Sequence, residues 1–151
     1  MRRQEREITD RGAIDAIIRR CRVCRLGLSD DGQPYVVPLS FGYDGTHIYF
    51  HAAHEGRKVD ILKRNSRVCF EFDLLEELIS ADKACNWSMR YQSVIGFGSA
   101  EFVTEPGAKI AALNCVMDQY SGRSWTFGEQ EVAATLVVRV RIDEIGGKAR
   151  L

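Results

Sequence analysis

The sequence lacks an excess of charge of either sign, because its 151 residues include 21 basic and 21 acidic side chains. A general nucleic-acid-binding protein usually carries a clear basic excess, so the balance disfavours that class. No apolar run approaches the ~20 residues that a membrane span needs. The charged start at residues 1–7 has no apolar stretch behind it, so we expect no signal peptide. A bound anion would have to be held by a local cluster of cations.

The cysteines lack regular spacing along the chain. The five cysteines are Cys21, Cys24, Cys69, Cys85 and Cys115. An odd count without regular spacing argues against a disulfide framework. Reduced thiols, together with the expected lack of an export signal, indicate a cytoplasmic protein.

Cys21 and Cys24 have the spacing of a redox or metal pair. A metal would need two further ligands, and no second pair of this kind exists. Redox pairs favour a helix start, whereas this pair spans the end of a predicted helix. Two buried structural thiols are the favoured interpretation. A weaker alternative is a zinc site that also uses Cys85 and a histidine.

Turn signals and apolar periodicity predict a helix, a run of strands and further helices. We expect strands at residues 22–28, 34–43, 46–52, 67–73, 88–103 and 133–142, and helices after residue 9 or 10, at 57–64 and at 105–120. Residues 74–84 fit either a loop or a short helix. Gly96 and Gly98 allow a bend or bulge in the long strand.

The expected fold class is mainly β, an antiparallel sheet better closed as a barrel than left open, with a few peripheral helices. The order of elements does not predict a parallel nucleotide-binding sheet, and Gly96-Phe97-Gly98 is too short to be a dinucleotide fingerprint. No linker or repeat interrupts residues 1–151, which we expect to form a single domain. No pair of carboxylates and no Ser-His-Asp order indicates a hydrolase.

Arg57 and Lys58 are the most informative pair, because they open a predicted helix directly after a strand that ends in small residues. Backbone N–H groups at a helix start favour phosphate, to which arginine and lysine add charged contacts. Cations at this end oppose the helix dipole unless an anion is present. The alternative is two solvated charges.

Three further residues could contact a planar ligand. His51, at a strand end, could touch a flavin or donate a proton, or it could simply be satisfied by backbone. Trp87 and Arg90 lie at the start of the long strand and could frame a ring. Aromatic residues at such a position also serve core or interface packing.

Several segments in order along the chain resemble the pyridoxamine 5′-phosphate oxidase-like flavoproteins, specifically the branch with the nitroimidazole-resistance (Nim-type) proteins. The matching segments are residues 24–26, 34–43 (PYVVPLSFGY), 48–53 (IYFHAA), 56–58 (GRK), 93–98 (SVIGFG) and 147–148. Each segment alone is weak, but together they cover nearly the whole chain.

This resemblance implies an antiparallel split β-barrel that forms a homodimer and holds FMN at the subunit interface. It also implies a set of flavin contacts. Val37, Pro38, Leu39 and Ser40 would lie along the isoalloxazine ring, and His51, Ala52 and Ala53 would line the ring or the ribityl chain. Arg57 and Lys58 would hold the phosphate, in agreement with the argument from the helix start. Trp87 and Arg90 would reach the flavin of the other subunit.

Ser93 stands where many relatives carry a glutamine after an arginine, and its shorter side chain puts that ring contact in question. The chain also lacks the C-terminal segment, with its substrate-binding tryptophan and arginine, of true pyridoxamine phosphate oxidases. Oxidation of that substrate is therefore disfavoured, and no metal site is expected.

The resemblance favours an FMN-dependent oxidoreductase that reduces a small electron-poor acceptor such as a nitroaromatic, with NADH or NADPH as electron donor. His51 is the candidate catalytic residue. One alternative is a non-enzymatic flavin carrier or sensor on the same barrel. Another is a related barrel that binds haem through a histidine.

Overall fold

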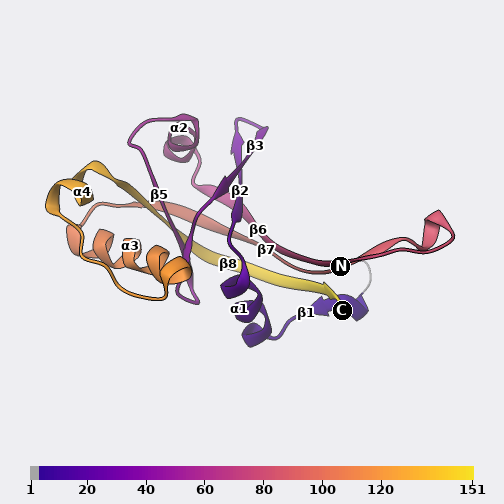
Figure 1. The fold of residues 1–151 in the computed structure, drawn as a ribbon. Helices are drawn as coiled ribbons and strands as arrows, with labels where there is room; N and C mark the ends of the chain where they lie inside the picture. The colour runs from indigo at the N-terminus through magenta and orange to yellow at the C-terminus, as the bar shows by residue number, and fades with distance from the viewer. Residues whose placement is uncertain (1–3) are drawn as a thin grey trace.

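The chain is built on one long antiparallel sheet with helices at its margins (Figure 1). The computed structural model describes residues 4–151. The strands are β1 (Glu7–Ile8), β2 (Cys24–Asp30), β3 (Gln33–Leu39), β4 (Gly42–Tyr43), β5 (His47–Ala52), β6 (Arg67–Ile79), β7 (Ser88–Val103) and β8 (Leu136–Arg150). The helices are α1 (Arg11–Arg20), α2 (Arg57–Arg64), α3 (Pro106–Ser121) and α4 (Glu129–Ala134), with 3₁₀ turns at Gln4–Arg6 and Ala84–Asn86.

The strands follow one another in the order β3-β2-β6-β7-β8-β5-β4, and β1 pairs with β8. All of these pairings are antiparallel. The end strands β3 and β4 are separated in the chain only by residues 40–41, so the sheet must curl back on itself. The described strands form no ladder between the two ends, so the curl stays open. The predicted mainly β, antiparallel split barrel with peripheral helices is confirmed.

Aromatic side chains fill the inside of the curled sheet. Phe41, Phe50, Phe70 and Phe72 are each at most 1% exposed. The rings of Phe41 and Phe72 lie 4.8 Å apart between centroids in a tilted arrangement, which is a favourable geometry for aromatic pairs. These residues come from β5, β6 and the β3–β4 connection, so the core joins both ends of the sheet.

Helix α1 packs against this core as its periodicity predicted. Asp10 caps it by accepting a hydrogen bond from the backbone N–H of Ala13 at 2.8 Å, which satisfies one free donor of the first turn. Ile14, Ile17 and Ile18 share one face and are buried. Their spacing of three and four residues is the reason that a single face can carry all three.

The predicted single strand at 34–43 was wrong in its second half, because it breaks at residues 40–41 into β3 and β4. Phe41 turns into the core, and its backbone N–H donates to the Tyr120 hydroxyl of α3 at 3.0 Å instead of to a strand. At Gly42 the chain runs so close to α3 that a Cβ would lie 2.5 Å from the Cys115 carbonyl carbon. Packing against the helix therefore overrides the local strand pattern.

Two of the long strands, β6 and β8, extend beyond their predicted ends. Residues 74–79, predicted as loop or helix, continue β6, and β8 runs to Arg150 instead of ending at Ile142. Asp143 interrupts the alternation of β8, because the register with β7 shifts there, and such a bulge hides a strand from a period-two pattern. The short elements β1 and α4 were not predicted.

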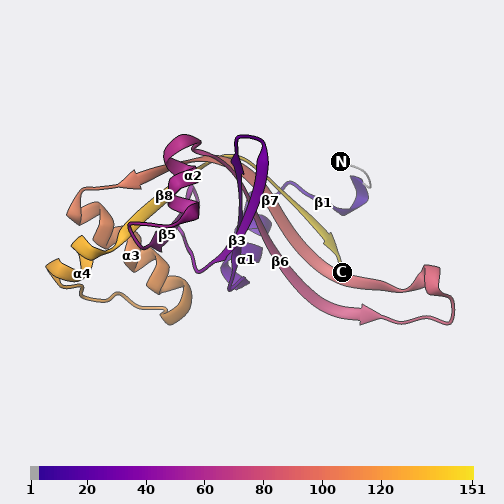
Figure 2. The ribbon, with the colours of Figure 1, turned by 90° about the horizontal axis from the view of Figure 1, so that it is seen from above.

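The extended β6–β7 hairpin projects from the barrel as an arm, which we define as residues 74–91 (Figure 2). The arm points away from the end of the molecule that carries α2, α3 and α4. Among residues 4–151, no helix combines the length and the apolar character that crossing a membrane would require.

Candidate functional site

The split in the barrel lies where β3, the end of β5 and the start of α2 come near one another, and we call this region the rim (Figure 1). Helix α2 buries Val59, Ile61 and Leu62, so its first turn is fixed relative to the strands. Within the described sheet, β3 pairs only with β2. The other edge of β3 therefore keeps free backbone groups, which can bind a ligand in the plane of the sheet.

The first turn of α2 concentrates positive charge at the rim. Its N-cap is Gly56, with φ of 135°, and no side chain caps the helix. The Arg57 guanidinium lies 4.5 Å from the centroid of the Tyr35 ring on β3. This is a cation–π distance, and the contact restricts the orientation of the planar guanidinium. Among residues 4–151, neither Arg57 nor Lys58 forms an ion pair with a carboxylate.

Lys58 is partly enclosed, and its ammonium lies 5.9 Å from the centroid of the Phe50 ring. This burial lowers the pKa of Lys58, because an apolar environment disfavours the charged form. A nearby phosphate would compensate the penalty. Uncapped N–H groups, a stacked guanidinium and a partly desolvated ammonium together make a site that fits a phosphate monoester.

The predicted ring-binding residues of β3 divide between two faces of the strand. Val37 and Leu39 pack against the core, whereas Pro38 and Ser40 are exposed. Only Ser40 lies outside the strand, in the turn towards β4. Contacts along this segment would therefore come from its backbone edge more than from its side chains.

His51 is exposed at the end of β5 and is the register partner of Val137 on β8. Partners across a ladder share a face, and Val137 packs on the side of the sheet that α3 covers. Phe50, below Lys58, points to the opposite face. Ala52 ends the strand and Ala53 is exposed beyond it. Ala53 therefore begins the loop that connects β5 to the positively charged first turn of α2.

The thiols of Cys21 and Cys24 are free and buried. Burial, with the charges of nearby carboxylates, raises the pKa of Cys21 to about 11, and burial also raises that of Cys24. A redox pair needs an accessible thiolate, and these thiols stay protonated. The described residues contain no group of three or more side chains placed to hold a metal. The structural interpretation of the pair is the one that agrees with this geometry.

Comparison with known proteins identifies the family to which the chain belongs. The family model of pyridoxamine 5′-phosphate oxidase matches residues 10–149. The chain belongs to this family. None of the curated proteins matches the chain.

Members of the pyridoxamine 5′-phosphate oxidase family and proteins of similar fold are found among solved structures. A candidate 5-nitroimidazole antibiotic resistance protein from Bacteroides thetaiotaomicron is 34% identical, with a TM-score of 0.85 over 94% of this chain and 85% of that one. The flavocytochrome Anf3 from Azotobacter vinelandii is 26% identical, with a TM-score of 0.86 over 100% of this chain and 72% of that one. A FAD- and haem-binding protein from Mycobacterium smegmatis shares the fold at 23% identity, with a TM-score of 0.86 over 95% and 73% of the two chains. These similarities support a flavin-binding, oxidoreductase-like family.

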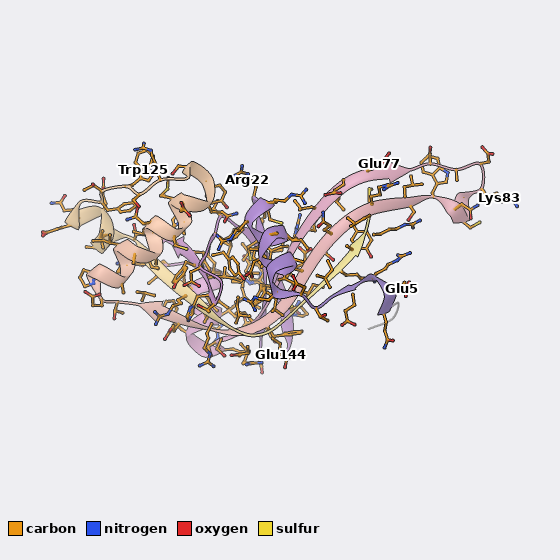
Figure 3. The ribbon with its side chains drawn as sticks, turned by 90° about the horizontal axis from the view of Figure 1, so that it is seen from below. Glu5, Arg22, Glu77, Lys83, Trp125 and Glu144 are labelled. Carbon is orange, nitrogen blue, oxygen red and sulfur yellow. The ribbon has the colours of Figure 1, made fainter. Side chains whose placement is uncertain are left out.

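In this member of the pyridoxamine 5′-phosphate oxidase family, the arm carries the remaining predicted flavin contacts. The Trp87 indole is 50% exposed and donates to the Ala81 carbonyl at 2.6 Å. Arg90 forms an ion pair with Glu77 at 3.0 Å. Figure 3 places Glu77 along the arm and Lys83 at its tip, far from the loop of Trp125.

Ser93 lies on β7 just outside the arm, where it is the register partner of Asp73 and Lys148. The single chain brings Tyr35 of β3 and Phe50 of β5 against the first turn of α2. His51 faces the other side of β5, and Trp87 and Arg90 lie on the arm. The residue that the prediction missed at the rim is Tyr35, which supports Arg57. Its alternation with Val37 and Leu39 along β3 would have indicated an inward-facing aromatic.

Proposed function

We propose that the chain is an FMN-dependent oxidoreductase that reduces a small electron-poor acceptor, such as a nitroaromatic, with NADH or NADPH as the electron donor. The observation that carries this proposal is the pair Arg57 and Lys58 at the uncapped start of α2, beside the free edge of β3. The similarity to a candidate nitroimidazole-resistance protein favours the nitroaromatic acceptor. Bound FMN would supply transfer of one or two electrons.

The residues of the rim have separate roles in this proposal. Arg57 binds the phosphate through its fork while Tyr35 holds the guanidinium plane, and Lys58 adds a point charge. The backbone edge of β3 orients the ring. His51, exposed at the strand end, contacts the acceptor and donates a proton to it.

The flavin site would be completed by a second copy of the chain. Trp87 and Arg90 lie on an arm that points away from the rim of its own chain, so in a homodimer they would serve the flavin of the partner. The outer face of the sheet fits such a contact. Val36, Ile95 and Phe97 are 62%, 50% and 45% exposed there. Clusters of exposed apolar side chains are typical of association surfaces.

The phosphate assignment is tested by the double variant Arg57→Ala/Lys58→Ala. Two charge-assisted contacts of about 1.5–3 kcal/mol each correspond to a loss of roughly 10²–10⁴ in FMN affinity. The matched control is Lys63→Ala/Arg64→Ala, which removes the same charge from the last turn of the same helix. FMN content is measured from the visible spectrum, and folding from circular dichroism and size-exclusion chromatography.

Full FMN occupancy in Arg57→Ala/Lys58→Ala, or an equal loss in the control, would refute the phosphate assignment. Anaerobic stopped-flow mixing with NADH or NADPH and then with a nitroimidazole tests the reaction. Reduction of the flavin without reoxidation by the acceptor would reject the nitroaromatic, and no reduction at all would favour a flavin carrier or sensor. A haem Soret band in the purified protein would instead favour the haem-binding alternative.

A further inference from the structure

A cavity of about 530 Å³ lies between α3, α4 and the loop that joins them. Figure 1 shows the two helices together at the end of the molecule opposite the arm. Eight residues line the cavity: Thr104, Pro106, Lys109, Ile110, Phe127, Glu129, Val132 and Ala133. Its volume lies within the range of about 300–1,000 Å³ that small-molecule sites occupy.

Lys109 is the unusual member of this lining, because it is a charged residue that is only 8% exposed. Among residues 4–151 its ammonium has no ion pair and no hydrogen bond. Every fully enclosed side-chain nitrogen or oxygen of the described chain does have a partner. Because the Lys109 ammonium has no such partner, it must keep access to solvent, and Lys109 is one of the residues that line the cavity. Lysine commonly buries its apolar stem while its ammonium stays in water, so this ammonium is available to an anion that enters the cavity.

The other charges near the cavity restrict the class of ligand that it could bind. The first-turn N–H groups of α3 are already capped by Glu105, which accepts from Gly107 at 2.9 Å and from Ala108 at 2.7 Å. The helix end therefore offers no second anion contact, and Glu129 adds a negative charge to the lining. One cation facing one acid disfavours a dianion such as phosphate.

We propose that this cavity binds a small apolar monocarboxylate. The carboxylate accepts hydrogen bonds from the Lys109 ammonium, and the apolar body packs against Ile110, Phe127 and Val132. This placement exchanges water at the Lys109 ammonium for a charge-assisted hydrogen bond, the strong class of such bonds.

The cavity is tied to the end of β5 by a direct contact. His54 lies with Nε2 3.1 Å from the carbonyl oxygen of Ala133, a residue of α4 that lines the cavity. An occupant that orders α4 would thereby order the segment after His51. The binding proposal itself depends only on the cavity and on Lys109, and stands whether or not FMN binds at the rim.

Binding is tested with sodium benzoate and the neutral analogue benzamide, each titrated into the ¹⁵N-labelled protein as purified with any cofactor it holds. We expect benzoate to shift the amide signals of Ile110 and Val132, and benzamide to bind at least about tenfold more weakly. Lys109→Met keeps the length and apolar character of the side chain and should weaken benzoate at least about tenfold. The control Lys63→Met, on the exposed end of α2, should leave benzoate binding unchanged.

Two further variants keep the test decisive if Lys109→Met does not fold. Lys109→Arg should retain binding of benzoate, and Glu129→Gln should strengthen it about two- to threefold by removing repulsion. Equal binding of benzoate and benzamide, or unchanged binding in Lys109→Met, would overturn the proposal. Shifts confined to the start of α2 would also overturn it, because they would place the carboxylate at the rim.

Discussion

Replacing Gly42 with alanine tests how tightly α3 is seated on the barrel. A Cβ at this position would lie 2.5 Å from the carbonyl carbon of Cys115, 2.5 Å from the nitrogen of Val116 and 2.8 Å from the carbonyl oxygen of Cys115. All three are backbone atoms, so no side-chain rotation can relieve the overlap. Ordinary van der Waals contacts of a Cβ begin at 3.4 Å, so the helix must move outward by about 1 Å.

The expected cost follows from two contributions. Overpacking at a well-packed contact costs about 1–3 kcal/mol. Moving α3 also strains the hydrogen bond of 3.0 Å from the Phe41 N–H to the Tyr120 hydroxyl, which contributes about 1 kcal/mol. A total of about 3 kcal/mol lowers the midpoint of thermal unfolding by about 6–12 °C in a domain of this size.

The matched control is Gly146→Ala in β8, where an added Cβ meets no atom within 4 Å. It should leave the midpoint unchanged or raise it slightly, because alanine loses less backbone entropy than glycine. Melting is followed by circular dichroism at two protein concentrations, so that any contribution from association is visible. In Gly42→Ala, the half-buried Cys115 should also react faster with a thiol reagent. Midpoints within about 2 °C of each other for the two variants would refute this account of the α3 contact.

Three further predictions concern thiols, acid stability and association. Ellman's reagent should label the exposed Cys85 first and leave Cys24, buried and with a raised pKa, unlabelled until the protein unfolds; labelling of both thiols at one rate, seen by peptide mass spectrometry, would contradict this. Partial burial would raise the pKa of Asp44, but hydrogen bonds from Tyr49 and neighbouring backbone N–H groups outweigh it and hold the pKa at about 2. The ionised carboxylate therefore stabilises the fold above about pH 4, and this stability is lost as the pH falls towards 2. The difference in melting midpoint between wild type and Asp44→Asn should shrink over that window, and a constant difference would be inconsistent with the assignment. Phe97→Glu should convert the proposed dimer to a monomer in light scattering, and an unchanged dimer mass would exclude that face as the contact.

The sequence predicted most elements of the barrel because local patterns reflect local causes. The apolar spacing of α1 and the turn signals between predicted strands each act within a few residues. The break between β3 and β4 could not be predicted in the same way. It depends on Tyr120, which accepts the Phe41 N–H although the two are 79 positions apart, and no window of neighbouring residues contains that information.

The candidate site shows the same division. The helix start at Arg57 is a local feature that the sequence displays directly, whereas its stacking on Tyr35 joins two elements through the curl of the sheet. Lys109 passed unnoticed because a lysine on an amphipathic helix normally faces solvent. Only its burial against the loop before α4 distinguishes it from an ordinary surface cation.

The unpaired edge of β3 has a consequence for the solubility of the protein. Such an edge would ordinarily recruit a strand from another molecule and seed aggregation. Pro34 and Pro38 occupy alternate positions around Val36, and proline has no N–H with which to continue a ladder. The edge can thus present carbonyl oxygens to a compact ring that donates N–H groups, while an approaching polypeptide finds too few donors to extend the sheet.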